Sequence, residues 1–211
     1  MLIGTQIAKG LHPFTQDRPM HVDPLELFQF WLRTAKPSEY HLSEAAQLAT
    51  VDTSGFPRVR TVLVKSIDEE GLVFYTNLRS PKAVHIQANP NVSLCFYWKS
   101  VARQVLASGR AHQIEHAEAA AYFDTRPLAR QLGAWASAQS QPIKDRDELE
   151  HKVKLVAEKF GTTCPRCPPF WGGFRVNVSR WEFLRVRDDR LNDRWLYERN
   201  YQGWEFKRLQ P

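Results

Sequence analysis

The sequence has few sulfur-containing residues and no long hydrophobic run. Of its 211 residues, three are cysteine and two are methionine. Three cysteines are too few for a disulfide framework in a chain of this size, which favours a reducing compartment. No window approaches the ~18 consecutive apolar residues of a membrane span, and residues 1–22 contain no apolar core of signal-peptide length. We therefore expect a cytoplasmic protein with no membrane partner.

Several signatures of catalysis and nucleotide binding are also missing. The sequence contains no GxGxxG turn, Walker loop or HExxH motif, and no pattern that suggests a Ser-His-Asp triad. Cys164-Pro-Arg-Cys167 has the spacing of half a zinc site, but no second pair follows, and a structural zinc needs four ligands. We predict no metal. If the protein is an enzyme, we expect a cofactor to carry the reaction.

The composition is that of a globular protein rich in sheet. Hydrophobic residues make up 43% and charged residues 25%, while twelve phenylalanines, seven tryptophans and thirteen prolines favour strands joined by turns. The net charge of +6 favours an anionic partner, but basic and acidic residues alternate along the whole chain. A nucleic-acid-binding barrel is the weaker alternative, because no basic patch is separated from the rest. Phosphorylated metabolites fit the same charge.

The order of predicted elements favours a barrel. Asp23-Pro24-Leu25-Glu26 carries helix-start signals, and further helices are predicted over 80–88, 117–124 and 146–160. Strands are predicted over 47–51, 58–66, 72–76, 92–98, 103–112, 174–178, 181–186, 195–199 and 204–208. Without a βαβ alternation, this order predicts one mainly β domain over 23–211, an antiparallel Greek-key-like barrel with peripheral α-helices. We expect residues 1–22 to form a flexible arm.

One segment near the end of the chain combines charge with strand-like alternation. If Arg190-Leu-Asn-Asp-Arg194 is extended, then Arg190, Asn192 and Arg194 point to one side. Three donors on one face suit a planar anionic or heteroaromatic ligand. The alternative is an edge strand with a solvated charged face.

Two further segments could bind phosphate. From Tyr75 to Lys82, hydroxyls and cations gather where a strand meets a helix N-terminus, whose free N–H groups favour anions. Tyr122 and Arg126 share a helical face, and Arg130 follows, so these three could clamp a second phosphate. Alternatively, the arginines only complement a helix C-terminus. In Arg60-Thr-Val-Leu-Val-Lys65 the two cations fall on opposite faces unless the strand is bulged.

Taken together, eight motifs resemble the pyridoxamine 5′-phosphate oxidase family. They are Arg60-Thr-Val-Leu-Val-Lys65, Tyr75-Thr76-Asn77, Ser80-Pro81-Lys82, Arg103-Gln104-Val105, Tyr122-Phe-Asp-Thr-Arg126-Pro127, Gly133-Ala-Trp-Ala-Ser-Ala-Gln139-Ser140, Phe170-Trp171-Gly-Gly-Phe-Arg175 and Arg190-Leu-Asn-Asp-Arg194. The resemblance covers nearly the whole chain from Asp23 onward. It implies an FMN-binding split β-barrel that forms a homodimer, with FMN at each subunit interface.

The resemblance also implies an activity and a set of site residues. The reaction is the oxidation of pyridoxamine or pyridoxine 5′-phosphate by oxygen to pyridoxal 5′-phosphate, with hydrogen peroxide and, from the amine, ammonia as further products. Residues implied to bind FMN are Arg60, Thr61, Val62, Leu63, Val64, Lys65, Tyr75, Thr76, Lys82, Gln104, Gln139, Ser140, Trp171 and Arg194. Residues implied to bind the substrate are Lys65, Tyr122, Arg126, Arg130, Arg190 and Asn192, of which Arg190 and Asn192 would act in catalysis at the pyridine ring.

Three positions depart from the family pattern. Asn192 stands where the family usually has histidine, and an amide cannot carry a proton. Pro81 replaces an arginine beside Lys82, a loss that Arg79 is placed to compensate, and Arg130 replaces a serine. These departures leave an alternative open: a protein of the same family that holds FMN or pyridoxal phosphate with weak or altered oxidase activity.

Overall fold

The computed structural model describes residues 22–39 and 42–211. Apart from Val22, the predicted N-terminal arm lies outside the described residues. The helices are α1 (Pro24–Ala35), α2 (Pro81–Ala88), the 3₁₀ turn η2 (Lys99–Val101), α3 (His116–Asp124), α4 (Leu128–Ala136) and α5 (Arg146–Phe160). The strands are β1 (Ala45–Val51), β2 (Pro57–Asp68), β3 (Gly71–Asn77), β4 (Asn91–Trp98), β5 (Arg103–Gln113), β6 (Trp171–Arg185), β7 (Asp193–Asn200) and β8 (Gly203–Leu209).

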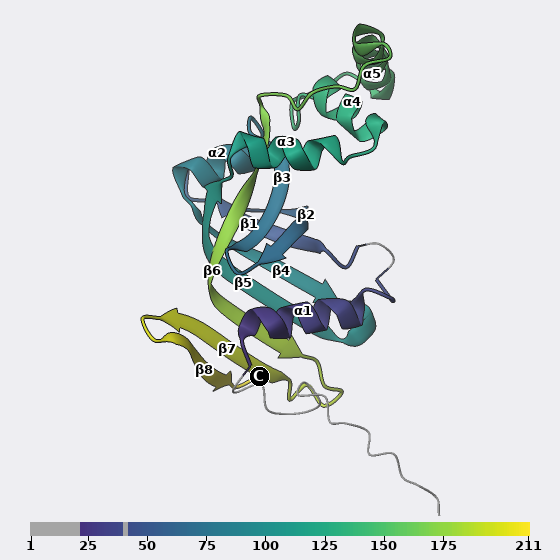
Figure 1. The fold of residues 1–211 in the computed structure, drawn as a ribbon. Helices are drawn as coiled ribbons and strands as arrows, with labels where there is room; N and C mark the ends of the chain where they lie inside the picture. The colour runs from purple at the N-terminus through teal and green to yellow at the C-terminus, as the bar shows by residue number, and fades with distance from the viewer. Residues whose placement is uncertain (1–21, 40–41) are drawn as a thin grey trace, which may run out of the picture.

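Six of the strands close into an antiparallel barrel, as predicted. The sheet order is β3-β2-β1-β4-β5-β6-β7-β8, and an additional pairing of β3 with β6 closes the ring. The neighbouring order β4-β1-β2-β3 is that of a Greek key, because the fourth strand returns to lie beside the first. Strands β7 and β8 continue the sheet beyond the barrel, at the end of the molecule opposite α3, α4 and α5 (Figure 1).

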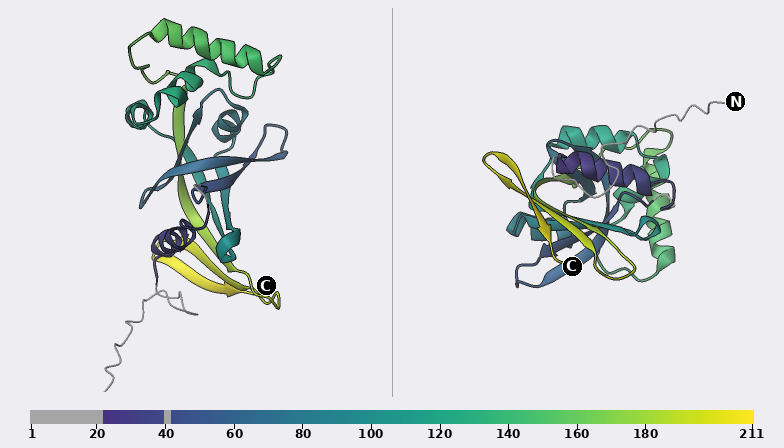
Figure 2. Two further views of the ribbon diagram at one scale, coloured as in Figure 1. Left: turned by 90° about the vertical axis from the view of Figure 1, so that its right-hand side faces the viewer. Right: turned by 90° about the horizontal axis from the view of Figure 1, so that it is seen from below.

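The long strand β6 joins the two ends of the molecule (Figures 1 and 2). Its first half pairs with β3 and its second half with β7, while β5 runs along its other edge. The sequence predicts two separate strands here, over 174–178 and 181–186, but the structure has one strand in which Ser179 is skipped by the pairing with β5. Gly109 faces this bulge so closely that a Cβ atom would lie 2.0 Å from the carbonyl oxygen of Asn177.

Helix α1 covers one part of the barrel core. Asp23 caps its N-terminus by accepting from the backbone N–H groups of Leu25 and Glu26, as the predicted helix start requires. Phe28 is fully buried, and its ring lies 4.8 Å from that of Phe96 and 5.0 Å from that of Trp181. The apolar face of α1 therefore fills the barrel on the side of β4 and β6.

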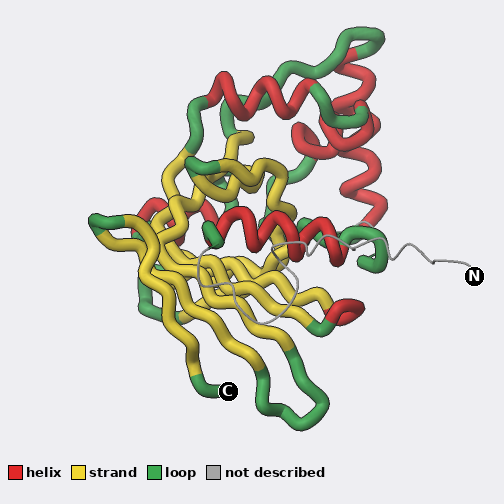
Figure 3. The backbone as a smooth tube through the Cα atoms, turned by 60° about the horizontal axis from the view of Figure 1, so that its bottom comes forward, coloured by secondary structure: helices red, strands yellow, loops and turns green. Residues whose placement is uncertain are grey.

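Two local features differ from what the sequence suggested. The shared face of Arg190, Asn192 and Arg194 required an extended segment, but Arg190 has φ +62° and lies in a turn, and β7 begins only at Asp193. The helix α4 was not predicted. It lies with α3 and α5 at one end of the molecule (Figure 1), where Figure 3 shows the helices in red. No helix in the described ranges is both long and apolar enough to cross a bilayer. That residues 23–211 form a single domain stays a prediction.

Candidate functional site

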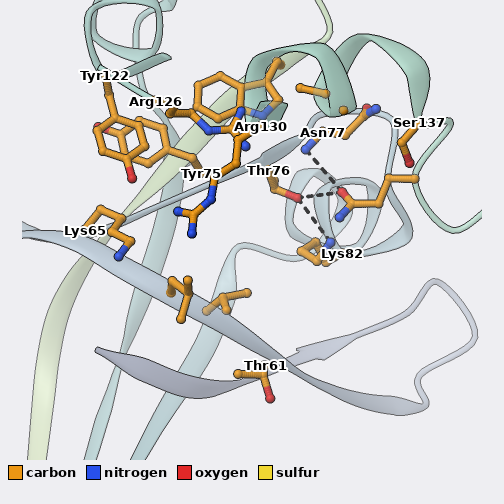
Figure 4. A pocket seen from close by; sticks show the side chains of 16 residues that line it. Thr61, Lys65, Tyr75, Thr76, Asn77, Lys82, Tyr122, Arg126, Arg130 and Ser137 are labelled. Atoms are coloured by element: carbon orange, nitrogen blue, oxygen red, sulfur yellow. Dashed lines mark hydrogen bonds between the residues drawn. The ribbon is translucent and has the colours of Figure 1, made fainter. Parts of the chain in front are cut away.

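A cavity of about 510 Å³ opens between the barrel wall and the helices at one end of the molecule (Figure 4). Strands β2 and β3 form one side, and α2, α3, α4, the segments after α3 and α4, and Trp171 at the start of β6 form the rest. Its volume lies within the usual range for small-molecule sites. The lining residues are Thr61, Val62, Leu63, Lys65, Tyr75, Thr76, Asn77, Lys82, Tyr122, Arg126, Arg130, Gly133, Ala134, Ser137, Gln139 and Trp171.

The cavity brings together most of the residues expected to form a site. Those that line it are Thr61, Val62, Leu63, Lys65, Tyr75, Thr76, Lys82, Tyr122, Arg126, Arg130, Gln139 and Trp171. Those that do not are Arg60, Val64, Gln104, Ser140, Arg190, Asn192 and Arg194. Two segments that are far apart in the sequence, the β2–β3 strand pair and the α3–α4 corner, thus contribute to one cavity.

Four lining residues were not named as site residues. Asn77 follows Thr76 in β3, and Gly133, Ala134 and Ser137 precede Gln139. All four lie inside motifs that carry the family resemblance, so the signal was present in the sequence. Asn77 also orders the turn after β3, because its Oδ1 accepts from the backbone N–H of Arg79 at 2.8 Å.

A β-bulge directs Lys65 into the cavity. Strand β2 pairs with β3 through Val64 and Phe74, then through Ser66 and Val73, so Lys65 has no partner on β3. The ammonium of Lys65 forms an ion pair with Glu44 at 2.7 Å. Extra residues at bulges re-aim side chains, and here the result is a cation at the cavity wall whose counter-ion sits on the neighbouring segment.

At one end of the cavity, Lys82 is buried among hydroxyl groups. Its Nζ donates to Thr76 Oγ1 at 3.2 Å and to Ser80 Oγ at 3.3 Å. Burial, and after it the charge of Arg60, lowers the pKa of Lys82 to about 8. Gln139 closes this end, because its Oε1 accepts from Thr76 Oγ1 at 3.1 Å. Figure 4 shows the bonds that Thr76 forms with Lys82 and Gln139 as dashed lines. An ammonium with only neutral partners is ready to bind an anion.

Two arginines near this end are held elsewhere. Arg60 donates from Nη1 to Thr50 Oγ1 at 2.7 Å and to the carbonyl of Leu48 at 3.1 Å. Arg79, expected to compensate for Pro81, lies over the ring of Phe170 at 4.9 Å and is not among the lining residues. The charge at this end of the cavity therefore comes from Lys82, with Arg60 close enough to influence its pKa.

At the other end, aromatic rings stack beside a guanidinium. The ring centroids of Tyr75 and Tyr122 are 4.0 Å apart with an interplanar angle of 8°, and Trp171 lies parallel to Tyr75 at 5.4 Å. The Arg126 guanidinium lies 4.9 Å over the Trp171 ring. Its Nη1 is buried and has no hydrogen-bond partner among the residues that the structure describes. This unpaired donor is suited to a ligand anion.

The C-terminal residues of the predicted site make contacts away from the cavity. Asn192 Oδ1 accepts from the backbone N–H of Arg187 at 3.0 Å, and Arg190 is exposed. Arg194 forms an ion pair with Glu182 at 2.6 Å. Strand β7, which carries Arg194, lies at the opposite end of the molecule from α3 and α4 (Figure 1). One chain alone therefore does not unite these residues with the cavity.

The closed barrel with its outlying strands and end-on helices places the chain in the class of split β-barrel proteins. More particularly, the chain belongs to the pyridoxamine 5′-phosphate oxidase family. The profile described as pyridoxamine 5′-phosphate oxidase matches residues 38–160. A second profile, the pyridoxine 5′-phosphate oxidase C-terminal dimerisation region, matches residues 171–211. The chain is an enzyme of this family, and the second match supports a homodimer.

Similar proteins agree with this assignment. A pyridoxine/pyridoxamine 5′-phosphate oxidase from Rubrobacter xylanophilus is 47% identical over 190 residues, which are 90% of this chain and 87% of that protein. One from an Enterobacter species is 44% identical over 196 residues, 93% of this chain and 89% of that protein. Among solved structures, PhzG from Burkholderia lata in complex with tetrahydrophenazine-1-carboxylic acid has a TM-score of 0.83 and 28% identity, over 90% of this chain and 93% of that one.

Proposed function

We propose that the protein oxidises pyridoxamine 5′-phosphate or pyridoxine 5′-phosphate to pyridoxal 5′-phosphate, with FMN as cofactor and oxygen as the final electron acceptor. The alcohol loses two hydrogens to oxygen, which gives the aldehyde and hydrogen peroxide. The amine reacts with oxygen and water to give the aldehyde, ammonia and hydrogen peroxide. The relatives that share 44–47% identity over most of the chain carry the name of this activity.

The observation that carries the proposal is the distribution of charge and flat surfaces in the cavity. Lys82 lies at one end, Lys65, Arg126 and Arg130 line the rest, and the Tyr75, Tyr122 and Trp171 rings are stacked. Two phosphorylated ligands, one with a flavin ring and one with a pyridine ring, require two anion-binding sites and planar side chains beside the rings. The buried Lys82 ammonium and the unpaired Arg126 Nη1 fit such ligands.

The residues near Lys82 would hold FMN. Lys82 would pair with the phosphate, Thr76 and Gln139 would offer hydrogen bonds, and Thr61, Val62 and Leu63 would form the wall supplied by β2. FMN, when bound, supplies a two-electron acceptor that oxygen can reoxidise. The protein around it has to align the substrate and exclude water, which is what rigid aromatic walls and fixed cations provide.

The α3–α4 corner and Lys65 would hold the substrate phosphate. Arg126 offers an unpaired donor, Tyr122 offers a phenol, and Arg130 adds a cation. Lys65 would exchange its ion pair with Glu44 for one with the phosphate, an exchange favoured by the higher charge of a phosphate dianion. This anchor would leave the reacting carbon of the substrate free to face the cofactor.

A second subunit would complete the site. Gln104, Arg190, Asn192 and Arg194 do not line the cavity of their own chain, and residues 171–211 match a dimerisation region. We therefore include in the proposal a homodimer with FMN at each interface, in which Arg190 and Asn192 lie against the pyridine ring. A cytoplasmic location also belongs to the proposal, supported by Cys95, Cys164 and Cys167 being free thiols.

Reconstitution with FMN followed by oxygen consumption tests the proposal. We expect a yellow protein that consumes oxygen and releases peroxide with pyridoxamine or pyridoxine 5′-phosphate. The unphosphorylated alcohol pyridoxine is the matched control and should give little turnover, because it lacks the group that the cations bind. A protein that takes up no FMN, or that oxidises both forms equally well, would contradict the proposal.

A binding protein of the same family is the second candidate. It is favoured by Asn192, whose amide cannot carry a proton and whose Oδ1 is already used by the backbone of Arg187. Such a protein would bind FMN or pyridoxal phosphate without efficient oxidation. Peroxide release with a phosphorylated substrate separates the two candidates, because only the oxidase produces it at a steady rate.

A further inference from the structure

The corner between α3 and α4 carries three of the cavity's polar side chains. Tyr122 lies in the last turn of α3, Arg126 follows the end of that helix, and Arg130 lies in the first turn of α4. The last carbonyl groups of a helix have no partner within the helix, so a tight corner needs donors from outside it. Which donors satisfy them decides how firmly the corner is held.

One buried side-chain amide bonds to two of these carbonyl groups and to one just beyond the helix. The two N–H groups of Gln131 Nε2 are shared among the carbonyl oxygens of Phe123 at 3.2 Å, Asp124 at 3.4 Å and Arg126 at 3.0 Å. Gln131 is 5% exposed, and its own backbone N–H donates to the carbonyl of Pro127 at 3.2 Å. The first turn of α4 is thereby bonded back onto the end of α3.

The hydrogen bonds of Gln131 hold the backbone from which Tyr122 and Arg126 project. One acceptor is the carbonyl of Arg126 itself, and another belongs to Phe123, whose ring lies 5.5 Å from the Arg126 guanidinium. Tyr122 comes directly before Phe123, and its ring stacks on Tyr75. Gln131 does not line the cavity, so any effect it has on a ligand passes through neighbouring residues that do, among them Tyr122 and Arg126.

We propose that Gln131 is a positioning residue that sets the direction of Arg126 and Tyr122 at the substrate phosphate. This inference rests on the proposed function for the identity of the ligand. A buried methionine would fill nearly the same volume, so it is the donor capacity of the amide that distinguishes positioning from packing. A displacement of Arg126 and Tyr122 by even about 1 Å would weaken their hold on the substrate phosphate.

The substitution Gln131→Met tests the proposal in the FMN-loaded protein. We expect KM for pyridoxine 5′-phosphate to rise about 10-fold, as for the loss of a buried hydrogen-bonding group. We expect kcat and the Kd for FMN to change less than about 2-fold, because Lys82 and Thr76 are not touched. In an Arg126→Ala background the same substitution should add little, since the residue it positions is gone.

A matched control separates positioning from general loss of stability. Trp98 Nε1 donates to the carbonyl of Ser43 at 2.8 Å, and this buried bond lies outside the cavity. Trp98→Phe therefore also removes one buried donor to a backbone carbonyl. We expect it to lower the melting temperature with KM unchanged. An unchanged KM in Gln131→Met, or a KM effect fully additive with Arg126→Ala, would overturn the proposal.

Amide hydrogen exchange gives a readout that does not depend on turnover. Thr125 N–H donates to the carbonyl of Tyr122 at 3.1 Å, and Arg126 N–H to that of Phe123 at 3.0 Å. These two amides should exchange faster in Gln131→Met than in the wild type, and no faster in Trp98→Phe. If the wild type oxidises neither substrate, the proposed function fails. Independently of that result, unchanged exchange of these two amides in Gln131→Met would contradict the role of Gln131.

Discussion

At the scale of single residues, Lys82 combines burial with positive charge. It is 8% exposed and its partners, Thr76 and Ser80, are hydroxyls. Removing an ammonium from water without a counter-ion is costly, and the lowered pKa of Lys82, about 8, expresses that cost. A bound phosphate would supply the missing charge. It would therefore raise the pKa of Lys82 again.

The affinity for FMN should consequently depend on pH. The charged form of Lys82 binds phosphate, so its contribution is fully present below a pH of about 8 and is lost as the pH rises toward the higher pKa of the complex. A phosphate monoester with a second pKa near ~6 stays a dianion over this range. Fluorescence titrations between about pH 7 and pH 9.5 should show Kd rising with pH.

The variant Lys82→Met serves as the control for this dependence. Losing a charged hydrogen bond typically costs about 1.5–3 kcal/mol, so we expect FMN binding to weaken roughly 10- to 100-fold at pH 7. The rise of Kd above a pH of about 8 should flatten in the variant. A wild-type Kd that is the same at both ends of the range would show that Lys82 does not pair with the phosphate.

Asn192 is the residue at which the proposed oxidase activity is most open to change. We expect Asn192→His to raise turnover on the order of 10-fold, because an imidazole can carry a proton near neutral pH. The Kd for FMN should change less than the rate. Steady-state kinetics and fluorescence titration measure the two effects. An unchanged or reduced rate would show that the site has been rebuilt around asparagine, whose Oδ1 accepts from Arg187 N–H.

At the scale of elements, Arg175 ties α3 to the barrel. Its side chain is 10% exposed and pairs with Asp68 at 2.7 Å in the β2 end, and with Glu118 at 2.9 Å in α3. Burial opposes ionisation of Asp68, but hydrogen bonds from Arg175 and Ser66 outweigh it and hold the pKa of Asp68 below its ordinary value of 3.8. The helix that carries Tyr122 is thus fixed at one end by Arg175 and at the other by Gln131.

Replacing Arg175 by methionine should destabilise the protein. Breaking a buried pair costs about 3–5 kcal/mol, but the carboxylates here are 40% and 41% exposed and partly screened, so we expect about 2 kcal/mol in urea unfolding at pH 7. The difference should shrink as the pH falls below 3.8, because protonated Asp68 no longer gains from the pair.

An exposed pair provides the control for this measurement. Arg146 and Glu150 on α5 lie 2.7 Å apart, with side chains 79% and 61% exposed. We expect Arg146→Met to change the free energy of unfolding by less than about 0.5 kcal/mol. Equal losses in the two variants would mean that the Arg175 pairs are no stronger than surface pairs.

The sequence predicted a helix correctly where its start signal is strong. It missed a helix that has no such signal, and it suggested a strand where a side chain sets a turn. The start of α1 was predicted because Asp23 and Pro24 are strong signals that the structure uses. Helix α4 begins at Leu128, after Pro127 at the N-cap position, which provides no side-chain cap, and the helix contains Gly133, so the sequence offers no clear start signal for it. At Arg190 the alternation suggested a strand, but Asp189 accepts from the N–H of Leu191 and sets a turn.

At the scale of the whole molecule, the sequence located the site only through its resemblance to a family. Composition and spacing alone predicted two separate phosphate seats, and nothing in them placed Lys65 opposite Arg126 in one cavity. That arrangement depends on the bulge at Lys65 and on the barrel closure between β3 and β6, both of which are tertiary features. The ion pair between Lys65 and Glu44 likewise spans segments whose pairing the sequence does not reveal.

The position of β7 leads to the last prediction. The turn before β7 lies in the matched dimerisation region and contains Leu191, which is 67% exposed between Arg190 and Asn192. If a second subunit covers this turn, Leu191→Asp places a charge in an apolar contact and should weaken the dimer by about 2–3 kcal/mol, roughly 30- to 100-fold. Analytical ultracentrifugation measures dimerisation, and a fluorescence titration measures FMN binding. Dimerisation and FMN binding should be lost together.

A leucine outside the matched region is the control. Leu155 on α5 is 50% exposed, and Leu155→Asp introduces the same charge without touching residues 171–211. It should leave both the dimer and the Kd for FMN unchanged. If Leu191→Asp instead stays dimeric and binds FMN normally, the turn at Arg190 does not contact a second subunit. Arg190 and Asn192 would then have no access to the ligand of the cavity beside α3 and α4, because their own chain holds them at the opposite end of the molecule.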